Sequence, residues 1–267
     1  MKKFILSFAV LISGVCMFAS CNLISSAGFN SKGLPTPDVR TADASVNIES
    51  TVKLDHSLWD ELLQKHVKSN GLVDYKGFKK DRAKLDRYLE MLSSQKPTDQ
   101  WSSSELLAYY INLYNAYTVD LILKNYPLKS IKDINGPWTK EFVKVGNKKL
   151  SLGAIENSIL RKMNEPRIHF AINCASISCP KLMNEAFTAD KIEQQLEKAT
   201  REFVNSDKND ISVTSAKLSS IFDWYKGDFT ENGMTLINYV NQYAKTKINK
   251  GAEISYKNYD WNLNEVK

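Results

Sequence analysis

The chain has 267 residues, of which 43% are hydrophobic and 25% are charged, and its formal net charge is +6 at neutral pH. Without Lys2 and Lys3 this charge falls by two to +4, and the remaining lysines are interspersed with acidic residues. The charge pattern therefore lacks the basic patch that nucleic-acid binding requires. The length is ample for a sizeable hydrophobic core.

The N-terminus has the pattern of a bacterial lipoprotein signal. Two lysines precede an apolar run in MKKFILSFAVLISGVCMFASC that is shorter than the ~20 residues of a bilayer span. Small residues before Cys21 resemble a lipobox, although Phe18 stands where Leu is usual. We expect a lipoprotein signal peptide over residues 1–21 and acyl chains such as palmitate on Cys21. The alternative is an ordinary secretory peptide with an incidental cysteine.

Lipid on Cys21 would anchor the chain to a membrane without spanning it, since each buried methylene contributes about 0.8 kcal/mol. No later stretch is apolar enough for a transmembrane helix. Asn22 follows the cysteine where Asp would be the alternative, and by resemblance to bacterial sorting rules this favours the outer membrane. We therefore expect a lipid-anchored protein of the cell envelope, with an envelope substrate or protein partner and no nucleic acid.

The rest of the chain divides into a tether and one domain. Residues 22–49 are rich in Ser, Gly, Pro and Asn and have no sustained apolar period, which predicts a flexible tether. Residues 50–267 show no second linker and no internal repeat, so we expect a single domain there.

Apolar periodicity, caps and turn residues predict the elements of this domain. Helices are expected over residues 55–68, 75–94, 105–125, 152–163, 188–204 and 234–245. A β-hairpin is expected around Gly146-Asn147 in WTKEFVKVGNKKLSL. Short strands are expected over residues 168–174, within 211–222 and in the tail 253–266, with a turn or short helix over 223–229. Helices dominate, so the predicted fold class is α+β, a predominantly helical single domain with short strands and a β-hairpin.

Two asparagines stand out in the predicted helix 105–125. Asn112 and Asn115 are three residues apart and share one face among apolar and tyrosine side chains. Asparagine forms helices poorly because its amide competes for backbone hydrogen bonds. Either both amides tie neighbouring loops to the core, or they line a pocket or orient a catalytic imidazole.

The segment RIHFAINCASISCPKL carries the candidate chemistry. In a strand over residues 168–174, His169 and Asn173 share a face, and Cys174 stands at its end. A thiol five residues from a histidine could form a thiolate–imidazolium pair. An ideal strand points His169 and Cys174 to opposite faces, so such a pair requires a sharp turn after Asn173. The alternative is a structural histidine beside an apolar stripe.

Cys174 and Cys179 are the thiols left in the folded part, because Cys16 leaves with the signal peptide and Cys21 would carry lipid. Export permits a disulfide between them if the loop curls. Metal binding is disfavoured because C-x4-C is wider than the usual zinc pair and lacks a second pair, so we expect neither metal nor cofactor. A redox dithiol more often has C-x-x-C spacing.

Five motifs resemble the family called domain of unknown function 547, and the resemblance covers nearly the whole domain. They are AYYINLYNAYTVDLIL, LSLGAIENSILR, PRIHFAINCASISCPKL, LSSIFDWYKGDF and YDWNLN. The resemblance implies a domain identity more than an activity. It also implies recurrent family positions, here Asn112, Asn115, Glu156, Arg161, His169, Asn173, Cys174, Ser176, Cys179, Pro180, Asp223 and Trp224. Asn157 stands where many relatives carry His, which weakens any scheme that needs a second imidazole there.

Two functions of different classes remain open at this level. In the first, the protein is a cysteine-dependent hydrolase or acyl transferase acting on envelope peptides. Cys174 or Cys179 is then the nucleophile, His169 the base, and Asn112, Asn115 or Glu156 holds the imidazole. In the second, it is a non-catalytic envelope binding or scaffold lipoprotein with a Cys174–Cys179 staple, whose aromatic residues form a contact surface.

Overall fold

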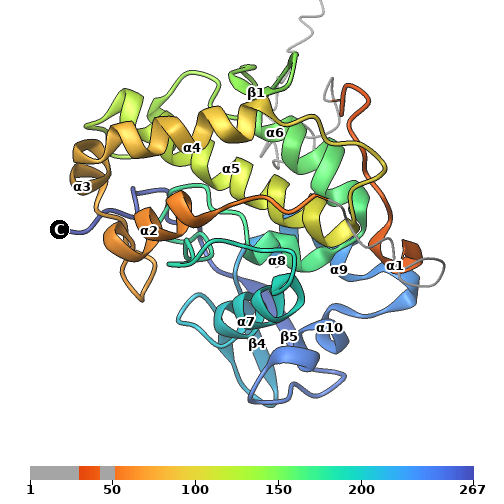
Figure 1. The fold of residues 1–267 in the computed structure, drawn as a ribbon. Helices are drawn as coiled ribbons and strands as arrows, with labels where there is room; N and C mark the ends of the chain where they lie inside the picture. The colour runs from red at the N-terminus through yellow and green to blue at the C-terminus, as the bar shows by residue number, and fades with distance from the viewer. Residues whose placement is uncertain (1–29, 43–51) are drawn as a thin grey trace, which may run out of the picture.

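The computed structural model of the chain describes residues 30–42 and 52–267 (Figure 1). The predicted signal peptide, Cys21 and most of the predicted tether lie outside these ranges. Within them, no helix combines the length and the apolar composition that crossing a membrane requires.

Residues 30–42 fall inside the predicted tether, yet they pack against the domain. Leu34 is buried, and the hydroxyl of Tyr110 donates to the backbone oxygen of Pro35 over 3.3 Å. The short helix α1 (Val39–Ala42) follows, and its Arg40 pairs with Glu231 at 2.6 Å. One buried leucine and a few polar contacts thus fix a stretch whose composition alone predicts a linker.

Three helices open the domain: α2 (Ser57–His66), α3 (Tyr75–Lys80) and α4 (Arg82–Ser94). The first confirms the predicted helix 55–68. The predicted helix 75–94 is divided at Asp81, whose carboxylate contacts the side chains of Lys65 and His66 at 2.7 and 2.6 Å. Asp81 itself has φ −96° and ψ 21°, outside regular helical geometry, a break that the periodicity does not report.

Helix α5 (Ser103–Asn125) confirms the predicted helix 105–125 and forms the centre of the core. The hydroxyl of Ser102 caps it by accepting from the backbone N–H of Glu105. Every residue from Glu105 to Leu123 is buried, as expected for a helix that is apolar on all sides. Figure 1 shows α5 running through the middle of the molecule, where it contacts α3, α4, α6 and α7.

The predicted β-hairpin is confirmed as β1 (Val143–Val145) paired antiparallel with β2 (Lys148–Leu150). Gly146 has φ +56°, a conformation that favours glycine at such a turn. The predicted helix 152–163 follows as a composite: α6 (Leu152–Ala154), the π-helical turn η3 (Ile155–Ile159) and the 3₁₀ turn η4 (Leu160–Met163). A further 3₁₀ turn, η2 (Ile131–Asp133), precedes the hairpin.

The strand predicted over residues 168–174 is wrong, because this segment begins with the 3₁₀ helix η5 (Pro166–Phe170). Pro166 suits the first turn of a helix, and the carboxylate of Glu165 caps it by accepting from the backbone N–H of Arg167 at 3.0 Å. His169 and Asn173 therefore do not share a strand face.

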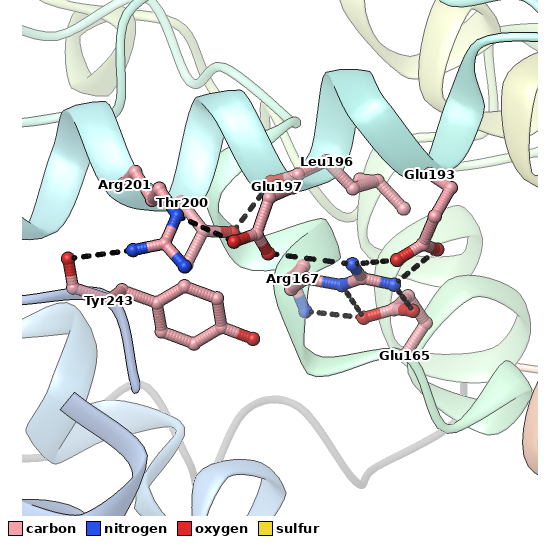
Figure 2. Close-up of polar contacts among 8 residues, drawn as sticks. All are labelled: Glu165, Arg167, Glu193, Leu196, Glu197, Thr200, Arg201 and Tyr243. Atoms are coloured by element: carbon pink, nitrogen blue, oxygen red, sulfur yellow. Dashed lines mark hydrogen bonds and ion pairs between the residues drawn. The ribbon is translucent and has the colours of Figure 1, made fainter. Parts of the chain in front are cut away.

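Helix η5 is tied to α7 (Ile192–Val204) by charged side chains. Figure 2 shows Arg167 between Glu165 and Glu193, and both ion pairs measure 2.6 Å. Further along α7, Arg201 pairs with Glu197. The helix α7 lies within the predicted helix 188–204. This network fixes η5, and with it the start of the candidate segment.

The C-terminal part completes the α+β class, which is confirmed. Strand β4 (Ser215–Leu218) pairs antiparallel with β3 (Asp210–Ile211) and parallel with β5 (Glu253–Tyr256). The register places Ser215 opposite Glu253, so the expected closing strand is present. The intervening helices are α8 (Ile221–Trp224), α9 (Lys226–Phe229), η6 (Glu231–Gly233) and α10 (Leu236–Tyr243).

Candidate functional site

Residues 173–180, called here the thiol loop, are closed by the side chain of Asn173. Its Nδ2 donates to the backbone oxygen of Pro180 at 2.6 Å, and its Oδ1 accepts from the backbone N–H of Ala175 at 2.8 Å. Both ends of the loop therefore meet at one buried amide. This closure brings together two cysteines that are separated by four residues.

A sharp turn within the thiol loop occurs at Ala175, which has φ +58°. Residues other than glycine rarely adopt this left-handed conformation, and such strain persists only where surrounding contacts enforce it. The C-terminal segment supplies those contacts, since Asn264 N–H donates to Ala175 O and Ile177 N–H donates to Asn262 O. The strained backbone beside Cys174 marks this loop as a candidate functional element.

The sulfur of Cys174 is surrounded by three potential donors. Its Sγ lies 2.9 Å from Cys179 Sγ, 3.3 Å from Ser176 Oγ and 3.3 Å from the hydroxyl oxygen of Tyr259. The contact with Cys179 lowers the pKa of the Cys174 thiol, and those with Ser176 and Tyr259 lower it further, against the opposing effect of burial. Cys174 as a residue is more exposed than Cys179, and both thiols are free.

Cys179 has the opposite character. It is buried, and the backbone N–H of Cys174 donates to its Sγ at 2.9 Å. Burial raises the pKa of the Cys179 thiol well above its usual value, and the neighbouring Cys174 adds to this effect. A cavity of about 420 Å³ borders Cys179 and Ser176, with Asn264 also in its wall. The loop therefore presents one ionisable sulfur and one neutral sulfur, the second beside a cavity.

His169 belongs to a second group, called here the imidazole cluster, with Asp228 and Arg161. The ring Nε2 lies 2.7 Å from Asp228 Oδ2, and Arg161 donates through Nε and Nη2 to the two carboxylate oxygens, both at 2.7 Å. Burial would raise the pKa of Asp228, but the hydrogen bonds from Arg161 and His169 outweigh it and hold that pKa well below the usual range. The ring of Tyr225 stacks on the imidazole at a centroid distance of 4.0 Å.

Glu156 lies between these two groups, on the π-helical turn η3. Its carboxylate accepts a short hydrogen bond from the hydroxyl of Tyr225 and a longer one, 3.5 Å, from Tyr114. Burial raises the pKa of both tyrosines, and the nearby charges of Glu156 and Cys174 raise it further. Glu156 and Cys174 are thus close enough to act on the same tyrosines. π-helical turns occur frequently at functional sites.

Asn112 and Asn115 both bind backbone. Asn112 Nδ2 donates to Phe187 O at 2.7 Å and its Oδ1 accepts from Phe187 N–H. Asn115 Nδ2 donates to Ala171 O at 3.0 Å and its Oδ1 accepts from Asn173 N–H at 2.8 Å. The two amides therefore dock the segments on either side of the thiol loop onto α5. The side chain that holds the imidazole is therefore Asp228, and the expectation that Asn112, Asn115 or Glu156 holds it is wrong.

Comparison with known proteins identifies part of this architecture. Residues 98–204 match the family model DUF547, described as a protein of unknown function. This segment belongs to the DUF547 family. No curated protein and no solved structure matches the chain. The DUF547 segment runs from the approach to α5 through α7, and it contains Glu156, His169 and both cysteines of the thiol loop.

The DUF547 segment brings the predicted site residues into one region but not into the predicted contacts. Among the residues that the structure describes, no hydrogen bond joins the His169 ring to Cys174 or Cys179. The sharp turn expected after Asn173 is present at Ala175, yet η5 directs the imidazole to Asp228.

The partners that sequence reasoning missed are Tyr225, Asp228 and Tyr259, which lie beyond the DUF547 match. They occur in the motifs DWYKGDF and YDWNLN. These motifs carry the family resemblance, but the sequence assigns no chemical role to Tyr225, Asp228 or Tyr259. Their distance along the chain hid their contacts, since Asp228 is 59 residues from His169 and Tyr259 is 85 residues from Cys174.

Proposed function

We propose that the protein is a lipid-anchored envelope enzyme in which Cys174 is the nucleophile of acyl transfer or hydrolysis on envelope peptides. The observation that carries the proposal is the environment of the Cys174 sulfur, which lies within hydrogen-bonding distance of the polar groups of Cys179, Ser176 and Tyr259. A thiolate is the reactive form of cysteine, and lowering its pKa is how proteins prepare it.

In the proposed reaction the Cys174 thiolate attacks the carbonyl carbon of a peptide. A thioester forms, the carbon–nitrogen bond breaks, and the amine leaves with a proton. Water or a second amine then attacks the thioester and releases Cys174. A cavity lined by Ser176 and Cys179 is the proposed site for part of the substrate; Cys174 belongs to the same loop but does not line the cavity.

His169 is the proposed base of the second step. A carboxylate only accepts, so the imidazole donates its Nε2 proton to Asp228, and Nδ1 of the neutral ring retains the lone pair. Asp228 then orients the ring, a role that a carboxylate has in other triads. The thiolate itself is stabilised by neutral donors and needs no imidazole contact.

The envelope location rests on the N-terminal sequence. The basic residues, the short apolar run and Cys21 support export and lipidation, and Asn22 after the cysteine supports attachment to the outer membrane. Labelling cells that express the chain with tritiated palmitate tests this part. Incorporation that disappears in Cys21→Ser supports lipidation at that residue, whereas equal labelling of the variant contradicts it.

The catalytic part is tested by trapping an acyl-enzyme. The full chain is mixed with p-nitrophenyl acetate, and peptide mapping by mass spectrometry locates the acetyl group. We expect a burst of acylation on Cys174 that Cys174→Ala abolishes and that the matched variant Cys179→Ala retains. Acetylation of Cys174 no faster than in the urea-unfolded chain would contradict the proposal. In His169→Gln, acylation should persist while release of the acetyl group slows.

A second candidate is a non-catalytic binding or scaffold lipoprotein with a Cys174–Cys179 staple. The 2.9 Å between the sulfurs favours it, because only a small movement would join them. A partly buried group of aromatic rings, Trp224, Tyr259 and Trp261, would then be its contact surface. Thiol counting on the unreduced protein before and after treatment with reduced glutathione separates the candidates, since a permanent staple leaves neither Cys174 nor Cys179 free in either sample.

A further inference from the structure

The thiol loop holds its two sulfurs closer than van der Waals contact, but farther apart than a disulfide bond. Cys174 Sγ and Cys179 Sγ are 2.9 Å apart, and both cysteines are free. The turn at Ala175 and the closure by Asn173 produce this proximity despite four intervening residues. C-x4-C spacing is wider than that of the usual redox pair, but this backbone conformation still brings the two sulfurs together.

The two thiols differ in the way that thiol–disulfide exchange requires. The first step needs an accessible thiolate, and Cys174 is partly exposed with a lowered pKa. The second step needs a thiol held beside the first sulfur, and Cys179 is buried there. Cys174 is also recessed among Ser176 and Tyr259, so a small disulfide reaches it more readily than a folded protein does.

We infer that Cys174 and Cys179 form a working dithiol–disulfide couple that reduces low-molecular-weight disulfides, with Cys174 as the attacking and Cys179 as the resolving thiol. This activity goes beyond the proposed acyl transfer and does not depend on it, because it needs both sulfurs and no carbonyl substrate.

The exchange has two steps. The Cys174 thiolate attacks one sulfur of a disulfide R–S–S–R, the S–S bond breaks, and one thiolate RS⁻ leaves. Cys179 then attacks the Cys174 sulfur of the mixed disulfide and expels the second RS⁻, which takes up the Cys179 proton. The two cysteines lose two electrons to form their disulfide, and the external disulfide is reduced to two thiols. A reduced thiol reverses both steps.

Oxidised glutathione serves as the probe. The reduced full chain is mixed with it at neutral pH, samples are quenched with acid and N-ethylmaleimide, and peptide mapping reports each cysteine separately. Mapping keeps Cys16 and Cys21 out of the result. We expect the wild type to form the Cys174–Cys179 disulfide with only a transient mixed disulfide, and excess reduced glutathione to reopen it.

Two variants assign the roles. Cys179→Ser should accumulate glutathione on Cys174, whereas Cys174→Ser should react at Cys179 at least about tenfold more slowly. Circular dichroism confirms that each variant is folded, and competitive alkylation of the unmodified wild type gives the same ranking without any substitution. Equal rates at the two thiols, failure to form the disulfide, or a disulfide that reduced glutathione does not reopen at any ratio would each overturn the inference. The last result would identify a permanent staple.

Discussion

The thiol loop and the imidazole cluster lie in the same part of the molecule but differ in the charge of the groups around the central side chain. The loop surrounds Cys174 with neutral donors, the hydroxyls of Ser176 and Tyr259 and the thiol of Cys179. In the cluster, His169 lies beside charged groups, since Asp228 contacts the ring and Arg161 donates hydrogen bonds to both carboxylate oxygens of Asp228.

This difference separates two tasks. Neutral donors at 2.9–3.3 Å can stabilise a thiolate and still release it to a reaction partner. A bidentate ion pair fixes geometry more firmly, so the cluster holds the imidazole in one orientation and with one basic nitrogen. Reactivity and orientation are therefore supplied by different residues, which can be changed separately.

The largest expected effect comes from removing the amide that docks the thiol loop onto α5. Asn115→Ala leaves Ala171 O and Asn173 N–H without partners in a buried place. Each unpaired buried group costs ~1–3 kcal/mol, so we expect the free energy of unfolding to fall by about 3 kcal/mol. Urea unfolding followed by circular dichroism measures the change.

Asn125→Ala on the same helix is the matched control. Asn125 is exposed and makes one bond to the backbone oxygen of Leu121, so its loss should cost less than about 1 kcal/mol. Equal losses in the two variants would show that α5 does not hold the loop through Asn115.

A smaller effect is expected from breaking the imidazole cluster. Asp228→Asn removes the carboxylate that pairs with Arg161 and His169, and unfolding at pH 7 should become easier by about 2 kcal/mol. Asp223→Asn, an exposed carboxylate in the preceding helix, should change stability by less than about 0.5 kcal/mol.

The same variant has a defined pH dependence. The pKa of Asp228 is lower in the folded chain than its value of about 3.9 when unfolded. Its contribution is therefore present above about pH 4 and is lost as pH falls through the folded pKa. The stability difference between wild type and Asp228→Asn should shrink below about pH 4, and a constant difference would contradict the pairing.

The smallest effect is expected at the sulfur itself. The midpoint of the pH–rate curve for iodoacetamide alkylation of Cys174 should lie below the ~8.5 of a free cysteine, because hydrogen bonds favour the thiolate. Tyr259→Phe removes one donor and should raise this midpoint by about 0.5 pH unit. Tyr256→Phe, at a tyrosine in β5 that pairs with Leu218 of β4, should leave it unchanged. A midpoint that does not move in Tyr259→Phe would remove this hydroxyl from the set of donors.

The sequence by itself determined the elements that depend on local periodicity and turn chemistry. The helix 105–125 follows from its Ser cap and its apolar composition, and the hairpin follows from Gly146-Asn147 between alternating runs. The α+β class and the family resemblance have the same origin. The residues of the site were also visible in the sequence, because His169, Cys174 and Cys179 stand within one short segment.

Only the tertiary structure decided how those residues meet. The segment at His169 reads as a strand, but Pro166 and the pairing of Arg167 with Glu165 and Glu193 make it a 3₁₀ helix. The imidazole consequently meets Asp228, and the sulfur of Cys174 meets Tyr259. Both contacts join residues more than fifty positions apart. Periodicity reports which side of an element is buried, whereas a contact across the core depends on how separate elements pack.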